Sequence, residues 1–318
     1  MRPGAPRCGD AADSWERVVR LPDFLIIGAQ KAGTTSLYFD LLQNPAVFMT
    51  SDKEPGNLIE DDVCTQRGRA EYANLFKRAR PAQVCGEAST GYTKLPDHPG
   101  VVDRARRVLG EDLKVVYIVR EPISRIRSHH HHERSGRRIS CDIDQAVQQY
   151  SRFVDYSRYT MQVTPWIDAF GRDQVFVMKF ESYIADRPTA VDAVSRFLGI
   201  DPAGNQIETD VVYNASSGKP ILKGPLQLVR PNVLYRKLIR PMLSARARQS
   251  LRRLVLPKAT GRAETPSEET VRYIVNELAD DVRQLSEIMG TDGPVWIFGD
   301  DRETTASTSP ARPGGHEG

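Results

Sequence analysis

The residues best suited to chemistry lie in two short stretches of this 318-residue chain. The first, residues 28–36, reads GAQKAGTTS and follows the apolar run FLIIG at 24–28. Glycines permit a tight turn, and a loop that enters a helix can direct backbone N–H groups at an anion. Lys31 adds a positive charge there. The pattern indicates a phosphate-binding loop, and the alternative is an ordinary glycine turn between a strand and a helix.

This loop departs from the pattern of nucleoside triphosphatases. Their motif GxxxxGK[ST] has a lysine after the second glycine, where this chain has Thr34, and the lysine here lies inside the loop. The arrangement that holds Mg²⁺ in those enzymes is therefore not expected, and we predict no metal. The residues predicted to bind an anionic nucleotide are Gln30, Lys31, Ala32, Gly33, Thr34, Thr35 and Ser36.

The second stretch begins at Arg120, directly after the apolar run at 113–119. Ligands of open α/β sheets bind at the carboxyl ends of strands, where this arginine would lie. Pro122 suits the first turn of a helix, and Ser128 follows Arg120 by about two helical turns. A guanidinium and a hydroxyl placed in this way can bind one phosphate. An arginine after a strand also commonly forms a surface ion pair, and that alternative stays open.

The elements that must position these residues alternate between strand and helix patterns. Apolar runs predict strands at 24–28, 113–119 and 174–178, and a further short run lies at 47–49. Helical patterns cover 34–43, 99–109, 122–134, 140–158, 188–199 and 267–289. Such alternation predicts βαβ units and a mostly parallel sheet covered on both faces. The expected fold class is α/β, with one domain at 21–301.

The composition excludes several classes of protein. Hydrophobic residues at 40% and charged residues at 27% exclude bulk disorder, and a net charge of +3 does not describe a generic nucleic-acid binder. Four cysteines without CxxC spacing favour a reducing compartment. We see neither an apolar run of membrane-helix length nor a signal peptide. A cytoplasmic protein is expected, with disordered tails at 1–20 and 302–318.

A basic segment at 219–262 contains no acidic residue. Its arginines and lysines interleave with leucines, which is typical of a basic helix. We interpret it as a helical lid or insertion over the core. The alternatives are a docking face for an anionic acceptor and a weak contact with a membrane surface.

Together, these stretches resemble the motifs of a known family. GAQKAGTTSLY and YIVREPISRIRSHHHHE are similar to sulfotransferases that use 3′-phosphoadenosine 5′-phosphosulfate (PAPS), in the branch of heparan sulfate and many bacterial sulfotransferases. The resemblance covers about 22–300, including Lys53-Glu54-Pro55 and GEASTGY at 86–92. It implies a P-loop NTPase-like three-layer fold. It also implies transfer of a sulfuryl group from PAPS to a hydroxyl, less readily an amine, of a carbohydrate, glycolipid or small molecule.

The resemblance also implies roles for residues around the donor. Lys31 matches the lysine that neutralises the leaving group as the S–O bond breaks. Arg120 and Ser128 match the residues that hold the 3′-phosphate. Lys219 follows a predicted lid loop and is a candidate for the same phosphate.

On the acceptor side, Glu54 matches the glutamate that serves as base in the heparan branch. His132, four residues after Ser128, matches a histidine that assists N-sulfotransferases. Related 3-O-sulfotransferases have a lysine where this chain has Ala88. Lys94 and Lys53 are the candidates to replace it.

Two other functions stay open at this point. A P-loop kinase that uses ATP and Mg²⁺ would share the loop, although it would be expected to carry lysine at position 34. A nucleotide- or polyanion-binding protein without catalysis would depend on the basic segment instead. Binding of adenosine 3′,5′-bisphosphate (PAP) rather than ATP–Mg²⁺ would separate a sulfotransferase from both.

Overall fold

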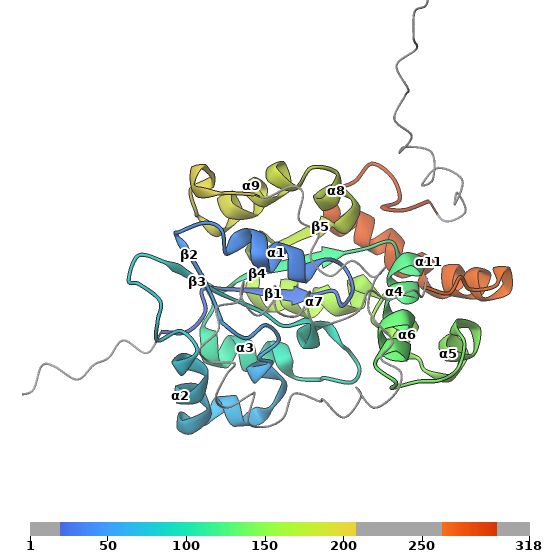
Figure 1. The fold of residues 1–318 in the computed structure, drawn as a ribbon, viewed down its shortest axis with the longest axis horizontal. Coiled ribbons are helices and arrows are strands. Elements are labelled where there is room, and N and C mark those ends of the chain that lie inside the picture. The colour runs from blue at the N-terminus through green and yellow to red at the C-terminus, as the bar shows by residue number, and fades with distance from the viewer. Residues whose placement is uncertain (1–19, 208–262, 298–318) are drawn as a thin grey trace, which may run out of the picture.

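The computed structural model describes residues 20–207 and 263–297. Its centre is one parallel sheet in the order β2-β3-β1-β4-β5 (Figure 1). The strands are β1 (Phe24–Gly28), β2 (Val47–Met49), β3 (Val84–Ala88), β4 (Lys114–Val119) and β5 (Val175–Lys179). All five residues of β1, and all of β4 except its first residue, are buried, as a sheet covered on both faces requires. The predicted parallel α/β sheet is confirmed.

Helices cover both faces of this sheet (Figure 1). Crossovers between parallel strands are right-handed. Helix α1 leads from β1 to β2 in one direction along the sheet, and α3 leads from β3 to β4 in the other direction. The two helices therefore lie on opposite faces. Helices α8 and α9 join α1, whereas α7 joins α3 and is covered by α11. The helices are α1 (Thr34–Leu41), α2 (Gln66–Asn74), α3 (Val101–Leu109), α4 (Pro122–Ser135), α5 (Ile143–Gln149), α6 (Arg152–Asp155), α7 (Tyr159–Phe170), α8 (Phe180–Ala185), α9 (Arg187–Leu198) and α11 (Glu268–Met289).

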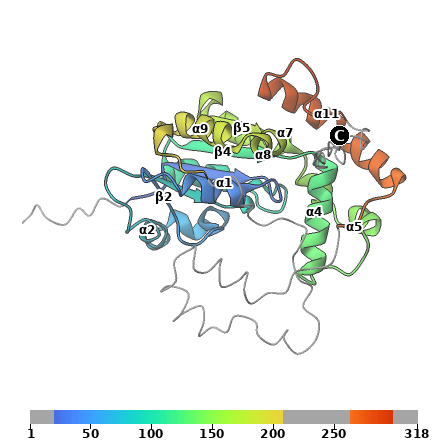
Figure 2. The same cartoon turned by 45° about the horizontal axis from the view of Figure 1, so that its top comes forward.

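The topology creates a ligand crevice beside β1. The chain leaves β1 toward β2 and β3 on one side, while β4 and β5 are added on the other side. The loops after β1 and β4 therefore diverge to opposite faces, and open α/β sheets bind ligands at such a point. Figure 2 shows α4 leaving the same edge of the sheet at which α1 begins. This edge positions both predicted stretches.

One predicted element was wrong. The helix expected over 140–158 is interrupted, because Tyr150 is extended at φ −130° and ψ 99° between α5 and α6. The interruption lets Phe153 enter the core, where its ring packs 4.6 Å from that of His129. A tertiary contact thus outweighs the local helical pattern.

The sequence patterns also missed four elements, α2, α7, α8 and β3. Strand β3 reads VCGEA, and both glycine and glutamate are depleted in strands. Gly86 is needed there because a Cβ at this position would overlap the ring of Phe24 on β1. In α7, Pro165 lies inside the helix and hid it from a pattern search.

Several predictions concern residues outside the described ranges. These are the basic segment 219–262, Lys219, the tail at 302–318 and residues 1–19 of the N-terminal tail. Within 20–207 and 263–297, no helix combines the length and the apolar character that crossing a membrane requires.

Candidate functional site

The predicted phosphate loop connects β1 to α1. The Ala29 N–H donates to the Ile118 carbonyl of β4 at 2.6 Å, which ties the loop to the neighbouring strand. Gly33 is the N-cap of α1 and has a φ of 93°, a conformation that favours glycine. Because the N-cap residue is a glycine, it has no side chain that could cap the first N–H groups of the helix. An anion at this helix N-terminus would satisfy them.

The predicted loop residues line the start of α1 in different environments. Ala32 and Thr34 are buried, whereas Lys31, Thr35 and Ser36 are half-buried. Gln30 is half-buried too, and within the described ranges its buried Oε1 has no hydrogen-bond partner.

Arg120 joins the two predicted stretches. Its Nη1 donates to the Lys31 carbonyl at 3.2 Å, and its guanidinium lies 4.7 Å from the ring centroid of Phe180. Burial lowers the pKa of Arg120 and the nearby Glu181 opposes this, so the group stays charged at neutral pH. No carboxylate of 20–207 or 263–297 forms an ion pair with it. Its other N–H donors are therefore available to an anion.

Phe180 is a site residue that the sequence analysis missed. It is the first residue of α8, directly after β5, and its ring packs against both Arg120 and Gly33. A Cβ on Gly33 would come within 2.6 Å of that ring. The only sequence signal was that an aromatic residue follows the apolar run 174–178 by two positions.

Helix α4 begins immediately after Arg120, as predicted. Pro122 is in its first turn, and the Glu121 carboxylate caps it by accepting from the Ile123 and Ser124 N–H groups at 2.8 and 2.6 Å. Ser128 lies two turns along and is only 4% exposed. The local sequence thus places a guanidinium and a buried hydroxyl on one connection.

Three of the four adjacent histidines on α4 are interior residues. His129 packs against Phe153 and lies 5.8 Å from the Tyr156 ring, and a ring nitrogen of His130 lies 3.1 Å from a backbone carbonyl. Burial, reinforced by the buried Arg125, holds the pKa of His129 well below its usual range. His131 is buried as well, whereas His132 is half-buried. His132 is therefore the member of the run with most access to a substrate.

Glu54 lies on the loop after β2. Its Oε2 accepts from the N–H and hydroxyl of Thr90 at 2.7 and 3.0 Å, and its Oε1 forms an ion pair with Lys53 at 2.5 Å. Lys53 Nζ also donates to Thr34 Oγ1 at 3.4 Å. The Glu54 side chain remains 43% exposed. The carboxylate is thus held beside the phosphate loop and open to solvent, and Thr90 is a further residue that the sequence analysis missed.

The segment that holds Glu54 is anchored by Glu87. This buried carboxylate accepts from the Tyr92 and Ser89 hydroxyls at 2.5 and 2.7 Å and also from Tyr72, and burial raises its pKa. Glu87 thereby orders residues 89–93, which include Thr90. It has a structural role in this arrangement.

The two lysines considered as replacements for the one absent at Ala88 differ in position. Lys53 contacts Glu54 directly. Lys94 Nζ lies 5.7 Å from the Tyr156 ring centroid, and burial lowers its pKa while Glu54 and other acidic groups oppose the shift. Lys94 is therefore near enough to interact electrostatically with Glu54.

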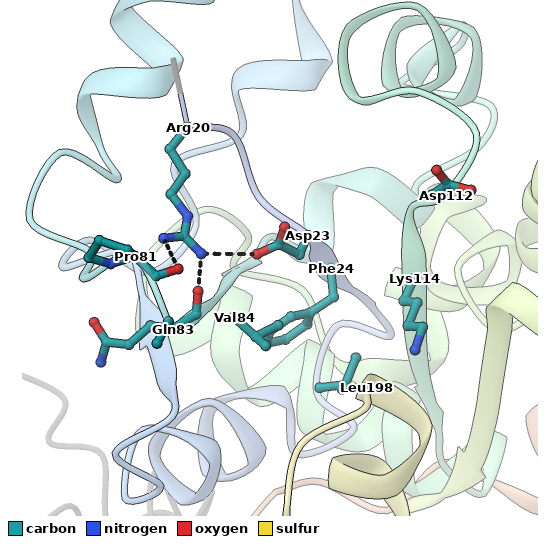
Figure 3. Close-up of a pocket in the computed structure, with 10 residues that line it drawn as sticks. Arg20, Asp23, Phe24, Pro81, Gln83, Val84, Asp112, Lys114 and Leu198 are labelled. Carbon is teal, nitrogen blue, oxygen red and sulfur yellow. Dashed lines mark hydrogen bonds and ion pairs between the residues drawn. The ribbon is translucent and has the colours of Figure 1, made fainter. Parts of the chain in front are cut away.

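A cavity of about 360 Å³ lies at the opposite end of the sheet (Figure 3). It is lined by Phe24, Val84 and Lys114, which are the first residues of β1, β3 and β4. The Arg20 guanidinium at its rim donates to backbone carbonyls of the chain around it, and Asp23 accepts from the Cys85 N–H. These polar groups stabilise strand ends and lie away from the phosphate loop. Among the residues described, no group of three or more acidic, histidine or cysteine side chains could hold a metal ion.

Comparison with known proteins agrees with this arrangement. A family model described as "Sulfotransferase domain" matches residues 21–227, well over half of the chain. Human heparan sulfate glucosamine 3-O-sulfotransferase 6 is 27% identical over 254 residues, which are 76% of this chain and 69% of that protein. Mouse bifunctional heparan sulfate N-deacetylase/N-sulfotransferase 4 is 25% identical over 62% of this chain, and the chain spans only 24% of its length.

A solved structure shares the fold. The sulfotransferase from Alicyclobacillus acidocaldarius superposes with a TM-score of 0.60 at 22% identity, covering 86% of this chain and 98% of that one. The fold, the phosphate loop and the family match all indicate the same class. The chain therefore belongs to the sulfotransferase family and is an enzyme of the sulfotransferase class.

Proposed function

We propose that the enzyme transfers the sulfuryl group of PAPS to a hydroxyl group of a carbohydrate or small-molecule acceptor. The contact between Arg120 and the Lys31 carbonyl is the observation that supports this donor most directly. It brings the proposed anion-binding loop to one end of the sheet together with a guanidinium that no carboxylate of the described residues pairs with. PAPS carries a 5′-phosphosulfate and a separate 3′-phosphate, whereas ATP has no phosphate at the 3′ position.

In this proposal the donor is held at two points. The loop 28–33 and the start of α1 bind the 5′-phosphosulfate through backbone N–H groups and Lys31. Arg120 and Ser128 bind the 3′-phosphate, and Phe180 keeps the guanidinium in place by stacking. Binding of the adenosine moiety thereby fixes the position of the sulfur atom, and this positioning accelerates the transfer.

The reaction is an in-line displacement at sulfur. The acceptor oxygen forms a bond to sulfur while the bond from sulfur to the 5′-phosphate oxygen breaks, and its electron pair stays on that phosphate. Lys31 stabilises the developing charge. Glu54 is the proposed base that takes the acceptor proton, because it is exposed and lies beside the loop. His132 assists at most.

A carbohydrate acceptor is supported by the names of the relatives, which refer to heparan sulfate. One of these names refers to 3-O-sulfation, which modifies a hydroxyl group, and the other to N-sulfation, which modifies an amine. A hydroxyl acceptor is the favoured form of the proposal, and an amine acceptor is its less favoured form. A kinase is disfavoured because Thr34 takes the place of the lysine of the triphosphatase motif.

The proposal is tested by comparing nucleotides by calorimetry. We expect PAP to bind without Mg²⁺ and more tightly than ATP–Mg²⁺. Labelled PAPS with a panel of carbohydrate and small-molecule acceptors then identifies the product. Preference for ATP–Mg²⁺ would indicate a kinase, and weak binding of both nucleotides would indicate a polyanion-binding protein.

A further inference from the structure

Lys53 is named above only as a candidate to replace the lysine absent at Ala88, and the proposed reaction gives it no step. It follows β2 and therefore reaches the site from a different connection than Lys31 does. Its side chain is 18% exposed, so the ammonium is held in a largely enclosed position. Its Nζ lies 3.4 Å from Thr34 Oγ1 and 2.5 Å from Glu54 Oε1.

These two contacts connect the donor side of the site with the acceptor side. Thr34 is the first residue of α1, at the end of the phosphate loop. Glu54 is the proposed base, and its N–H donates to the Ala88 carbonyl at 2.9 Å, at the end of β3. Arg120, by contrast, follows β4, on the other side of β1. Lys53 thus lies on the opposite side of the phosphate loop from Arg120, beside the proposed base.

We propose that Lys53 is a catalytic residue that binds the sulfuryl group during transfer. This inference rests on the proposed function. The ammonium donates to a non-bridging sulfuryl oxygen, while Lys31 serves the phosphate oxygen that leaves. The three N–H donors of a lysine allow it to keep one contact at the loop as it does so.

The same contact couples Lys53 to the proton transfer. As the acceptor oxygen attacks sulfur, the bond from sulfur to the phosphate oxygen breaks with its electron pair, and the acceptor proton passes to Glu54. Protonation removes the negative charge of that carboxylate, so its attraction for Lys53 is lost. The positive charge of Lys53 is then available to the sulfuryl oxygens at the stage when they need it.

The test uses Lys53→Met, which keeps the length of the side chain and removes its charge, and Lys53→Arg, which restores a charge. Lys114→Met is the matched control. Lys114 is half-buried, as Lys53 is, and its ammonium donates to the Phe197 carbonyl, but it lies at the opposite end of the sheet. Calorimetry gives the affinities for PAPS and for PAP, which lacks the sulfuryl group. Labelled PAPS gives the transfer rate at saturation, and circular dichroism checks the fold.

We expect Lys53→Met to leave the PAP affinity within about twofold of the wild-type value. Its PAPS affinity should fall by about tenfold and its transfer rate by about 10- to 100-fold, the size of a charge-assisted hydrogen bond. Lys53→Arg should recover most of both losses, and Lys114→Met should show neither.

Equal losses for PAP and PAPS would show that Lys53 binds the 5′-phosphate, and would overturn the inference. Unchanged PAPS affinity and transfer rate in a folded Lys53→Met variant would overturn it too. Failure of the proposed function is distinguishable, because the wild-type enzyme itself would then bind neither PAP nor PAPS.

Discussion

Lys31 and Glu54 share a backbone conformation that is uncommon for residues with a side chain. Their φ angles are 72° and 64°, and Arg137 is the third such residue in the described part of the chain. The left-handed conformation costs an L-residue about 1–2 kcal/mol. Such strained residues cluster at functional sites, where surrounding contacts hold them. Here Arg120 binds the Lys31 carbonyl, and Ala88 accepts from the Glu54 N–H.

The strain at Lys31 allows its chemical and conformational roles to be separated. Both Lys31→Ala and Lys31→Gly should lower the turnover number by two or more orders of magnitude, about 2.7 kcal/mol. Lys31→Gly should be the more stable of the two by about 1 kcal/mol, because glycine accepts the positive φ. Urea unfolding and labelled PAPS measure the two effects. Near-normal turnover in either folded variant would remove Lys31 from the mechanism.

Arg120 should affect binding of the 3′-phosphate rather than chemistry at sulfur. Arg120→Ala should weaken PAP binding by about 1.5–3 kcal/mol, the range for hydrogen bonds to charged groups. Affinity for adenosine 5′-phosphosulfate, which has no 3′-phosphate, should barely change. Calorimetry with both nucleotides decides this, and equal losses would mean that Arg120 has another role.

Glu54 and His132 can be ranked as bases. Glu54→Gln keeps the shape of the side chain but removes its ability to take the proton, so turnover should fall by about 10²–10⁴-fold while PAPS still binds. His132→Ala should cost less. Turnover at saturating PAPS and acceptor, with PAPS affinity measured separately, gives the comparison. A fully active Glu54→Gln enzyme together with an inactive His132→Ala enzyme would reverse the two roles.

At the scale of elements, α4 has two tasks. Its N-terminal end carries the connection from Arg120 and its middle carries the buried Ser128. Its second half packs buried histidines against α6, where the ring of Phe153 lies tilted against that of His129. Glu133 lies 4.0 Å from His129 and binds Arg138 at 2.7 Å. The second half of the helix is thus held in place by buried rings and by the ion pair of Glu133.

His129 makes the stability of this element sensitive to acid. Its pKa in the folded protein is held far below 6.5 by burial and by Arg125, so the unfolded chain takes up the proton first as the pH falls. The contribution of His129 to the free energy of unfolding is therefore fully present above pH 6.5 and is lost as the pH falls below that value. The loss is up to about 2 kcal/mol between pH 8 and pH 5. In urea unfolding, the free energy of unfolding of His129→Phe should fall less between pH 8 and pH 5 than that of the wild-type protein does. An unchanged pH dependence would contradict the assignment.

At the scale of the whole molecule, the segments that follow all five strands form one site. The loop after β1, Lys53 and Glu54 after β2, the segment after β3, Arg120 after β4 and Phe180 after β5 come from distant parts of the sequence. A ligand that contacts several of these segments stabilises only the folded state, in which they are together.

PAP should therefore stabilise the entire fold. At 100 times its dissociation constant it should raise the free energy of unfolding by about 2.7 kcal/mol, and EDTA should not reduce the effect. Chemical denaturation with and without PAP measures this. The control is Asp112→Asn, which changes the cavity at the opposite end of the sheet. PAP should raise its free energy of unfolding as much as that of the wild-type protein. If PAP did not stabilise this variant, the ligand would bind at that cavity and not at the phosphate loop.

The sequence by itself determined the parts of this protein that depend on local spacing. A glycine loop between an apolar run and a helix, and an arginine at the end of another run, predicted two stretches at one edge of a parallel sheet, and the structure places them in contact. That the loop binds phosphate stays a prediction. Periodicity placed β1, β4, β5, α4 and α11 to within a few residues, because their cores are defined by residues close in the chain.

Only the tertiary structure decided which side chains meet. Three contacts of the site join residues that are 19 to 60 positions apart in the sequence. They are the contact of Lys53 with Thr34, the hydrogen bond from Thr90 to Glu54 and the packing of Phe180 on Arg120. The same is true of the interruption at Tyr150 and of the three buried histidines. Burial and pairing depend on which segments the sheet brings together, and no local pattern contains that information.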